Sequence, residues 1–287
     1  MSTETALPPP AIAPAEPSTF RKALRQKRFT VGLAITVLVV AFVIFAPYVA
    51  PYGESEVTGP PFSKDGFLGT DYLGHDVLTR VMYGGREILI IALLGTLLGM
   101  VLGTAIGVVA AYGGGWWDEV IMRLNDVVLS FPQILLALLV LTAIQKPSAW
   151  ILIVLVGVSH APRVARLARG VALGIVTRDF VIAAEALGER RSRVILAEVL
   201  PNMNAPLLAE GGLRLTFSIG LVGSLGFLGF STDLGAANWG QMIQENRLGL
   251  STQPWAVMAP VLMIAIFCIG TNLMADGIAQ VAQRGEN

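Results

Sequence analysis

Six stretches of apolar residues, each about 20 residues long, restrict what this sequence can fold into. A helix rises 1.5 Å per residue, so each stretch can cross the ~30 Å hydrocarbon core of a bilayer. Charged residues make up 14% of the 287 residues, against about 25% in soluble domains. The sequence therefore predicts an all-α membrane protein with six transmembrane helices. These are expected at residues 31–49, 88–111, 126–143, 149–171, 207–230 and 255–275.

Three arginines lie toward the end of the fourth stretch. Arg163, Arg166 and Arg169 follow one another at intervals of three residues. A charge at the bilayer centre costs ~2.5–3.5 kcal/mol on insertion scales. We therefore expect these side chains at or beyond the membrane interface, extended toward water.

The basic residues divide unequally between the two sides of the membrane. With the N-terminus inside, only Lys64, Arg80, Arg86, Lys146 and Arg247 fall in outside segments. Cytoplasmic loops carry an excess of lysine and arginine, so we expect both termini and the 172–206 loop in the cytoplasm. The inside segments hold Arg21, Lys22, Arg25, Lys27, Arg28, Arg123, Arg163, Arg166, Arg169, Arg178, Arg190, Arg191, Arg193 and Arg284.

The chain divides into four regions by composition. Residues 1–19, rich in proline and alanine, are expected to be a disordered tail. Residues 20–86 hold the first span, which is long and has no A-x-A-like cleavage site, and a long outside loop. Residues 87–280 form a core of five spans, and 281–287 a short tail. The single cysteine, Cys268, cannot form an intrachain disulfide.

Glycines are spaced regularly in two of the spans. Gly95, Gly99, Gly103 and Gly107 share one helix face, which predicts close packing against another helix. The fifth span has glycines every three residues, and we expect a break or an irregular end there, where protein or a water-filled cavity covers the backbone. These glycines are Gly220, Gly223, Gly226 and Gly229.

A polar segment at 179–201, DFVIAAEALGERRSRVILAEVLP, interrupts the apolar spans. Asp179 and Ser192 are suited to cap two short helices, and Gly188 to end the first in a left-handed conformation. Ala183 and Ala184 would leave a low-profile face that fits a groove of another protein. The segment therefore predicts a helix-turn-helix docking loop.

This segment resembles the EAA loop of ABC importer permeases. The pattern E-A-A, three residues, Gly, nine residues, I-x-L-P aligns with Ala183, Ala184, Gly188, Leu200 and Pro201. Two positions differ, since Ile182 and Glu198 stand where the pattern has Glu and Ile. The resemblance implies that residues such as these contact an ATPase. We assign that role to Asp179, Phe180, Ala183, Ala184, Leu187, Gly188, Arg190, Arg191, Leu200 and Pro201.

Three other segments resemble permeases of the dipeptide, oligopeptide and nickel importers. The segment LGTDYLGHDVLTR precedes the second span, with His75 in place of an arginine, and Asp71, Asp76 and Arg80 are candidates for pairing and for contact with an outside partner. The run YGGGWWDEVIMRLNDVVLSFP matches the family at eight positions. GSLGFLGF followed by NWGQMI is similar to the family's fifth span and the residues after it, with Asn238 in place of a serine.

The resemblance implies the type I ABC importer permease fold, with a cytoplasmic coupling helix, in a bacterial inner membrane. It also implies a second, homologous permease subunit, two ATP-binding subunits that hold ATP and magnesium, and an extracytoplasmic solute-binding protein. Peptides are the expected solute, with nickel chelates, glutathione and oligosaccharides as alternatives. The chain has no P-loop sequence of its own, and its zero net charge gives no indication of nucleic acid.

Two other classes of protein agree less well with the sequence. A membrane enzyme is disfavoured because the sequence has no H-E-x-x-H or G-x-S-x-G motif, and its two histidines and one cysteine are too few for a metal site. An ion-coupled transporter would be expected to bury carboxylates within its spans. Asp126, Glu210 and Asp276 instead fall near the predicted cytoplasmic ends.

Overall fold

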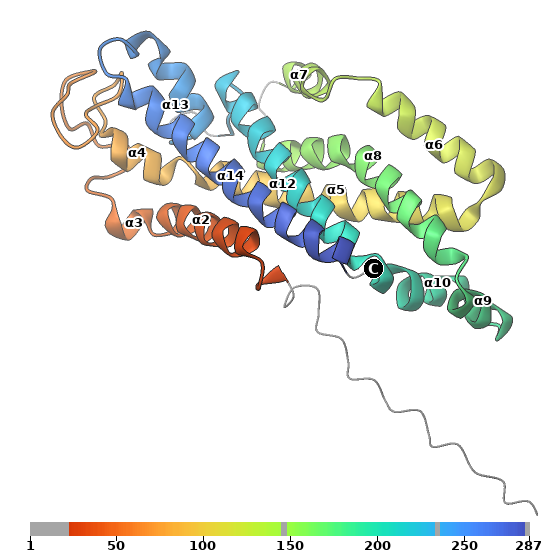
Figure 1. Ribbon diagram of the computed structural model, residues 1–287. Coiled ribbons are helices and arrows are strands. Elements are labelled where there is room, and N and C mark those ends of the chain that lie inside the picture. Colours follow the sequence, from red (N-terminus) through yellow and green to blue (C-terminus); the bar gives the residue numbers. More distant parts are fainter. Residues whose placement is uncertain (1–22, 145–147, 233–235, 285–287) are drawn as a thin grey trace, which may run out of the picture.

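The computed structural model describes residues 23–144, 148–232 and 236–284. Within these ranges the regular elements are helices, joined by turns and loops, and the β-structure is limited to two isolated β-bridges. The predicted tail at 1–19 lies outside them. Figure 1 shows an elongated bundle with short helices at both ends. The elements are α2 (Lys27–Ile44), α3 (Ala46–Val49), α4 (Val77–Tyr83), α5 (Arg86–Gly113), α6 (Gly115–Leu129), α7 (Gln133–Ala143), α8 (Ala149–Val176), α9 (Asp179–Ala186), α10 (Arg191–Val194), a π-helical turn (Ile195–Val199), α11 (Leu200–Asn202), α12 (Asn204–Phe227), α13 (Trp239–Asn246) and α14 (Trp255–Arg284).

Five of these helices are long and apolar enough to cross a membrane, which confirms five of the six predicted spans. The third predicted span is not one continuous helix. It is divided into α6 and α7, which meet at an angle of 77°. Pro132 explains the break, because proline has no N–H for the helix ladder and disfavours helical geometry in the residue before it.

The parallel pair α5 and α8 forms the most extensive helix contact. All four glycines of the predicted packing face lie against α8. A Cβ atom added at Gly95 would meet Val156, and one at Gly107 would meet Ala168. At Gly103, a Cβ would lie 2.5 Å from both Ala161 O and Val164 Cβ. The backbones of the two helices are therefore in direct contact. Such packing through small residues is common in membranes, because lipid offers no hydrophobic driving force for helices to associate.

Helices α2, α12 and α14 complete the bundle, and they too meet at small residues. Gly32 on α2 lies against the backbone of Gly270 on α14. Gly212 on α12 lies against Ala275. The close approach of backbones at these points fixes the positions of α2 and α12 along α14.

Helix α12 is continuous through three of its four regularly spaced glycines, so the expected break is absent and only the end is special. Gly229 has φ +90°, and the N–H of Phe230 donates to Leu225 O at 2.9 Å. This is a Schellman termination, which needs a residue without a Cβ penalty at the left-handed position. Gly226 serves packing instead, because α13 approaches it closely through Gly240.

The outside loop is folded against a second segment at the same end of the bundle. We call residues 51–85 together with residues 236–254 the cap. The Gln253 side chain donates to the carbonyls of Ser63 and Leu68, both at 3.0 Å. Trp239 is fully buried and donates from Nε1 to Val81 O at 2.7 Å. These contacts give a long connection its own small core at the end opposite α9 (Figure 1).

Candidate functional site

The loop 172–206 lies at one end of the bundle and is anchored to it by a separate hydrophobic cluster. Val181 of α9 is buried in this cluster together with Val108 of α5 and Ala172 of α8. The hydroxyl of Tyr112, at the end of α5, donates to the Glu185 carboxylate of α9. Helix α9 is therefore held directly by the two helices that pack along the glycine face.

Gly188 ends α9 as predicted. Its φ is +80°, its N–H donates to Glu185 O at 2.9 Å, and the N–H of Glu189 donates to Ala184 O at 3.2 Å. These two bonds form a Schellman motif. The chain then turns into α10, and the predicted helix-turn-helix is confirmed as local structure.

The two predicted N-caps are wrong. The cap residues are Arg178 for α9 and Arg190 for α10, and neither helix has a side-chain capping bond. Asp179 is instead the first residue of α9, where a negative charge still interacts favourably with the helix dipole. Ser192 lies inside α10.

Leu200 and Pro201 follow a π-helical turn at Ile195–Val199. Proline at position 201 has no N–H to donate, and a π turn is a common way to accommodate such a disruption. Leu200 is half-buried against the cluster around Val181, whereas Pro201 is exposed. Leu200 therefore helps to anchor the loop, and Pro201 is available at its surface.

The outward side of α9 is apolar and exposed. Phe180 is 39% exposed, Ile182 54% and Leu187 85%. Ala183 and Ala186 are also exposed and lie on the same side, three or four residues from Ile182 and Leu187. Exposed apolar faces of this kind are typical of protein or membrane interaction sites.

Ala184 does not belong to this outward side. It is half-buried and packs against the hydrophobic cluster that holds Val181. The expectation that Ala184 provides clearance for a docked protein is therefore corrected: its small size serves the packing of α9 on its own chain.

The arginines after Gly188 form an exposed basic rim. Arg190 and Arg191 are exposed, and Arg193 pairs with Glu189 at 3.1 Å on the surface. Exposed pairs of this kind contribute about 0.2–1 kcal/mol. The rim therefore adds positive charge to the loop more than it adds stability.

The sequence did not indicate how α6 is held to α8. Asp118 accepts two hydrogen bonds from Arg169, both at 2.5 Å, and Asp126 pairs with Arg166 at 2.6 Å. Asp118 and Asp126 of the run that begins YGGGWWD thus pair with two of the three regularly spaced arginines of α8. Their spacing could have suggested the pairing, since each set repeats along one helix face.

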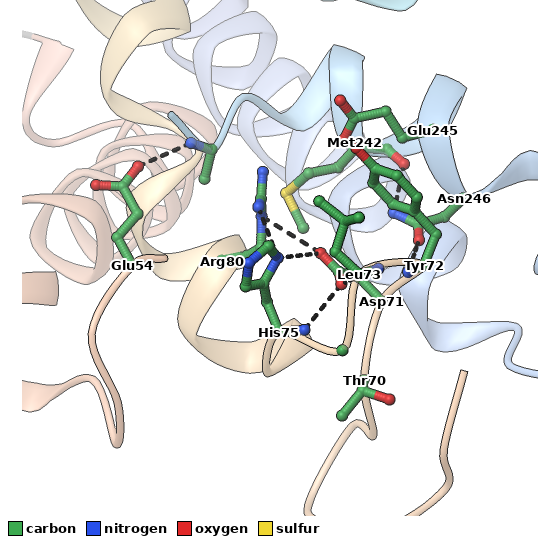
Figure 2. A network of polar contacts seen from close by, with 12 residues as sticks. Glu54, Thr70, Asp71, Tyr72, Leu73, His75, Arg80, Met242, Glu245 and Asn246 are labelled. Atoms are coloured by element: carbon green, nitrogen blue, oxygen red, sulfur yellow. Dashed lines mark hydrogen bonds and ion pairs between the residues drawn. The ribbon is translucent and has the colours of Figure 1, made fainter. Parts of the chain in front are cut away.

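The outside residues chosen as partner contacts are buried in the cap. Figure 2 shows Asp71, His75 and Arg80 in contact. Asp71 lies 3.1 Å from His75 Nδ1 and 3.6 Å from Arg80 Nε. Asp76 does not join them, because it caps α4 by accepting from Thr79 N at 2.7 Å. These residues are 1–7% exposed, so their role here is to fold the cap. A partner would meet other residues such as Phe67, which is 83% exposed.

Burial, followed by the nearby charge of Glu245, raises the pKa of the Tyr72 phenol in the same network. The backbone N–H of Tyr72 donates to Asn246 Oδ1 at 2.9 Å (Figure 2). Across the described ranges, no group of three or more His, Cys, Asp or Glu residues is placed to hold a metal ion.

Comparison with known families identifies this architecture. The family described as binding-protein-dependent transport system inner membrane component matches residues 103–284, which include the α9 loop. The chain belongs to this family. The N-terminal transmembrane domain of oligopeptide transport permease C matches residues 18–63. The protein is therefore the multi-pass transmembrane permease subunit of an ATP-driven ABC importer, in a family whose members are non-catalytic membrane subunits.

Related permeases are similar over almost the whole chain. The dipeptide transport system permease protein DppC of Alkalihalophilus pseudofirmus is 32% identical over 97% of this chain and 94% of its own length. The oligopeptide transport system permease protein OppC of Bacillus subtilis is 29% identical, over 88% of this chain and 84% of its own. The glutathione transport system permease protein GsiD of Pectobacterium atrosepticum is 31% identical, over 90% and 87%.

The fold also resembles a solved permease. The MetNI methionine ABC transporter, in an inward-facing conformation, superposes with a TM-score of 0.56. The match covers 70% of this chain and 95% of the other, at 18% identity. This likeness supports the type I importer fold of the permease core.

Proposed function

We propose that this permease forms half of the translocation path of a peptide importer. The observation that carries the substrate class is the 32% identity to a dipeptide permease over 97% of the chain. In this proposal the second half of the path is a homologous permease subunit. An extracytoplasmic binding protein delivers the peptide to the cap, and two ATPase subunits supply ATP, magnesium and hydrolysis.

We further propose that α9 is the coupling helix on which an ATPase subunit docks. Its support is the exposed apolar side formed by Phe180, Ile182, Ala183, Ala186 and Leu187. Closure of the ATPases would displace α9 as a rigid element. Because Val181 and Glu185 attach α9 to the ends of α5 and α8, the displacement would pass directly into the pair of helices that packs most closely.

The coupling role is tested at Ala186. Ala186→Trp adds bulk to the outward side without touching the internal cluster, whereas Ala186→Ser keeps the size. In the purified complete importer, Ala186→Trp should lower ATPase-subunit recruitment and substrate-stimulated hydrolysis at least tenfold, and Ala186→Ser should behave as wild type. Normal recruitment and hydrolysis in the tryptophan variant would remove the coupling assignment.

The substrate class is tested separately by uptake. Proteoliposomes with the complete importer and its binding protein should accumulate radiolabelled dialanine when ATP is present on the ATPase side. Glutathione, nickel chelates and an oligosaccharide serve as competing solutes. Uptake of one of these without uptake of dialanine would reassign the substrate and leave the permease function unchanged.

The orientation is proposed from the excess of basic residues on the α9 side, with both termini in the cytoplasm. Single cysteines at Ser192 and Phe67 are suited to test it, since both positions are exposed and lie at opposite ends of the bundle. The cysteines are introduced into a Cys268→Ala chain. In intact cells, a thiol reagent that cannot cross the membrane should label the cysteine at position 67 and not the one at position 192. Labelling at position 192 would reverse the proposed orientation.

A further inference from the structure

An ion pair lies buried within the fifth span. Glu210 and Arg214, one turn apart on α12, are 2.8 Å apart, with side chains only 9% and 12% exposed. Their depth follows from their neighbours. Ser218 bonds to Thr96 at 2.7 Å, and Gly211 lies next to Met100, so both contacts fall in the middle of α5. Glu210 is in the second turn of α12 (Asn204–Phe227), near the end at which it was expected, and Gly211 beside it lies against the middle of α5.

Arg163 of α8 lies near this pair. It lies beside Gly103 of α5, which contacts Ala161 and Val164. Gly103 is eight residues, or about 12 Å of helix, before Ala111, the predicted end of the second span. Arg163 therefore lies within the candidate span Ala149–Val176 and not beyond its end as predicted. Arg163 follows His160 by three residues on α8, and Arg214 precedes Ser218 by four residues on α12. His160 Nε2 and Ser218 Oγ are 2.8 Å apart, so both guanidinium groups lie about one helical turn from the same contact.

Arg163 has no carboxylate of its own among the described residues. Its polar contact in this part of the chain is with Gln133, whose Oε1 accepts from Nη1 at 3.3 Å. The side chain is exposed in the single subunit, yet a lipid-facing arginine at this depth would cost ~2.5–3.5 kcal/mol or more. The surface around Arg163 must therefore face water or protein.

The backbone next to Arg163 supports a water-filled side. Gln133 is the first residue of α7, directly after the break between α6 and α7. Interrupted helices at membrane depth are tolerated where they line a cavity or are covered by protein. A chain of polar contacts runs inward from the same point. Gln133 donates to Ser159 Oγ at 2.9 Å, and Ser218 Oγ lies 2.8 Å from His160 Nε2.

We propose that Arg163, Arg214 and Gln133 form a binding site for the carboxylate of the solute within the translocation path. The identity of the ligand as a peptide rests on the proposed function. The location of the site rests on the charges of this cluster. Two guanidinium groups face one carboxylate, so the cluster carries one uncompensated positive charge. Arg214 Nε is buried without an aligned hydrogen bond, although Glu210 is at ion-pair distance. A peptide C-terminus supplies the missing charge and acceptor atoms, and guanidinium groups recognise carboxylates well.

The site predicts that the surroundings of position 163 are wet and select anions. The test uses Gln133→Cys in a Cys268→Ala background, in the purified complete importer, so that both arginines are kept beside the new thiol. Labelling rates are measured with a sulfonate-bearing and a trimethylammonium-bearing methanethiosulfonate reagent, and each ratio is referred to that of a cysteine at the exposed position Phe67. We expect the ratio of anionic to cationic labelling to be at least tenfold higher at position 133. Adding Arg163→Gln, which removes the uncompensated charge, should abolish the preference.

Trialanine and its C-terminal amide then serve as probes of the carboxylate. Trialanine should slow labelling at position 133, and the amide should not. Absence of labelling by both reagents, absence of an anion preference, or equal protection by the two peptides would each overturn the site. The first two are the results expected if lipid covers the arginine or if a carboxylate of the second subunit neutralises it.

Uptake of trialanine by the wild-type importer separates this inference from the proposed function. If labelling shows the anion preference and the protection by trialanine but the peptide is not taken up, the carboxylate site is supported and the peptide is refuted as the substrate. If trialanine is taken up but labelling shows no anion preference, the peptide importer is supported and the carboxylate site is refuted. Arg163→Gln should also lower trialanine uptake at least tenfold while Arg163→Lys, which keeps the charge, retains most of it. Equal uptake by wild type and Arg163→Gln would contradict the site.

Discussion

Replacing Gly103 by leucine tests whether α5 and α8 are held together by direct backbone contact. Even the first atom of a new side chain would lie 2.5 Å from Ala161 O and from Val164 Cβ. Carbon atoms are in favourable contact at about 3.5–4.0 Å. The helices must therefore separate locally by roughly 1 Å or more, since neither neighbour is the free end of a flexible side chain.

The size of the effect follows from the dispersion energy lost across the gap. A gap of 0.5–1 Å forfeits about a quarter to a half of each contact, and each contact is worth ~0.1–0.2 kcal/mol. If the interface around Gly103 has on the order of 50 such contacts, as a buried leucine has, the loss is ~2–4 kcal/mol. In lipid, no hydrophobic contrast between helices restores it.

The assay is SDS-induced unfolding of the chain in mixed micelles, followed by tryptophan fluorescence. Gly220→Leu is the matched control, because a Cβ at Gly220 on α12 meets no atom within 4 Å. Gly103→Leu should unfold at a clearly lower SDS fraction than the control. Identical unfolding of the two variants would refute the idea that the glycine face bears the α5–α8 contact.

Three other predictions concern the α9 loop, the pairing of α6 with α8, and the cap. Gly188→Ala should cost roughly 1 kcal/mol because of the positive φ, with faster proteolysis between α9 and α10, whereas Gly188→Asn should behave closer to wild type. Asp118→Asn should destabilise the chain in SDS by ~1–2 kcal/mol, because Arg169 loses a charged partner; unchanged unfolding would show that the pair is replaced by water. Arg80→Gln should cost about 3 kcal/mol by leaving Asp71 buried without its cation, and it should be seen as rapid proteolysis of the cap; a protease-resistant variant would show that His75 suffices.

The spans and the α9 loop could be predicted because their signals are local. Apolar length fixes a membrane helix regardless of its neighbours, and the left-handed Gly188 is required by the turn that follows α9. The four glycines of α5 predicted a packing face for a similar reason. Their partner, α8 of the same chain, could not be read from the pattern, because any helix with small residues would satisfy it.

What failed from sequence depends on relative depth and on which side of a helix faces inward. Counting residues puts Glu210 near the end of its span, where α12 has it, but does not reveal that the neighbouring Gly211 packs against the middle of α5. The alanine pattern predicts an outward Ala184, whereas this residue packs on the internal cluster. The buried position of Asp71 likewise depends on α13 and on a loop more than 150 residues away, which no local pattern encodes.

The seam between α5 and α8 also limits how the length of this chain can change. A helix turns about 100° per residue, so inserting one residue between Gly99 and Gly103 would rotate Gly103 and Gly107 away from α8 and bring bulky neighbours into their place. The same insertion would turn Tyr112 away from Glu185. Sequence drift in α5 should therefore occur by substitution outside the glycine positions, and gains or losses of residues should be confined to the connections beyond the seam.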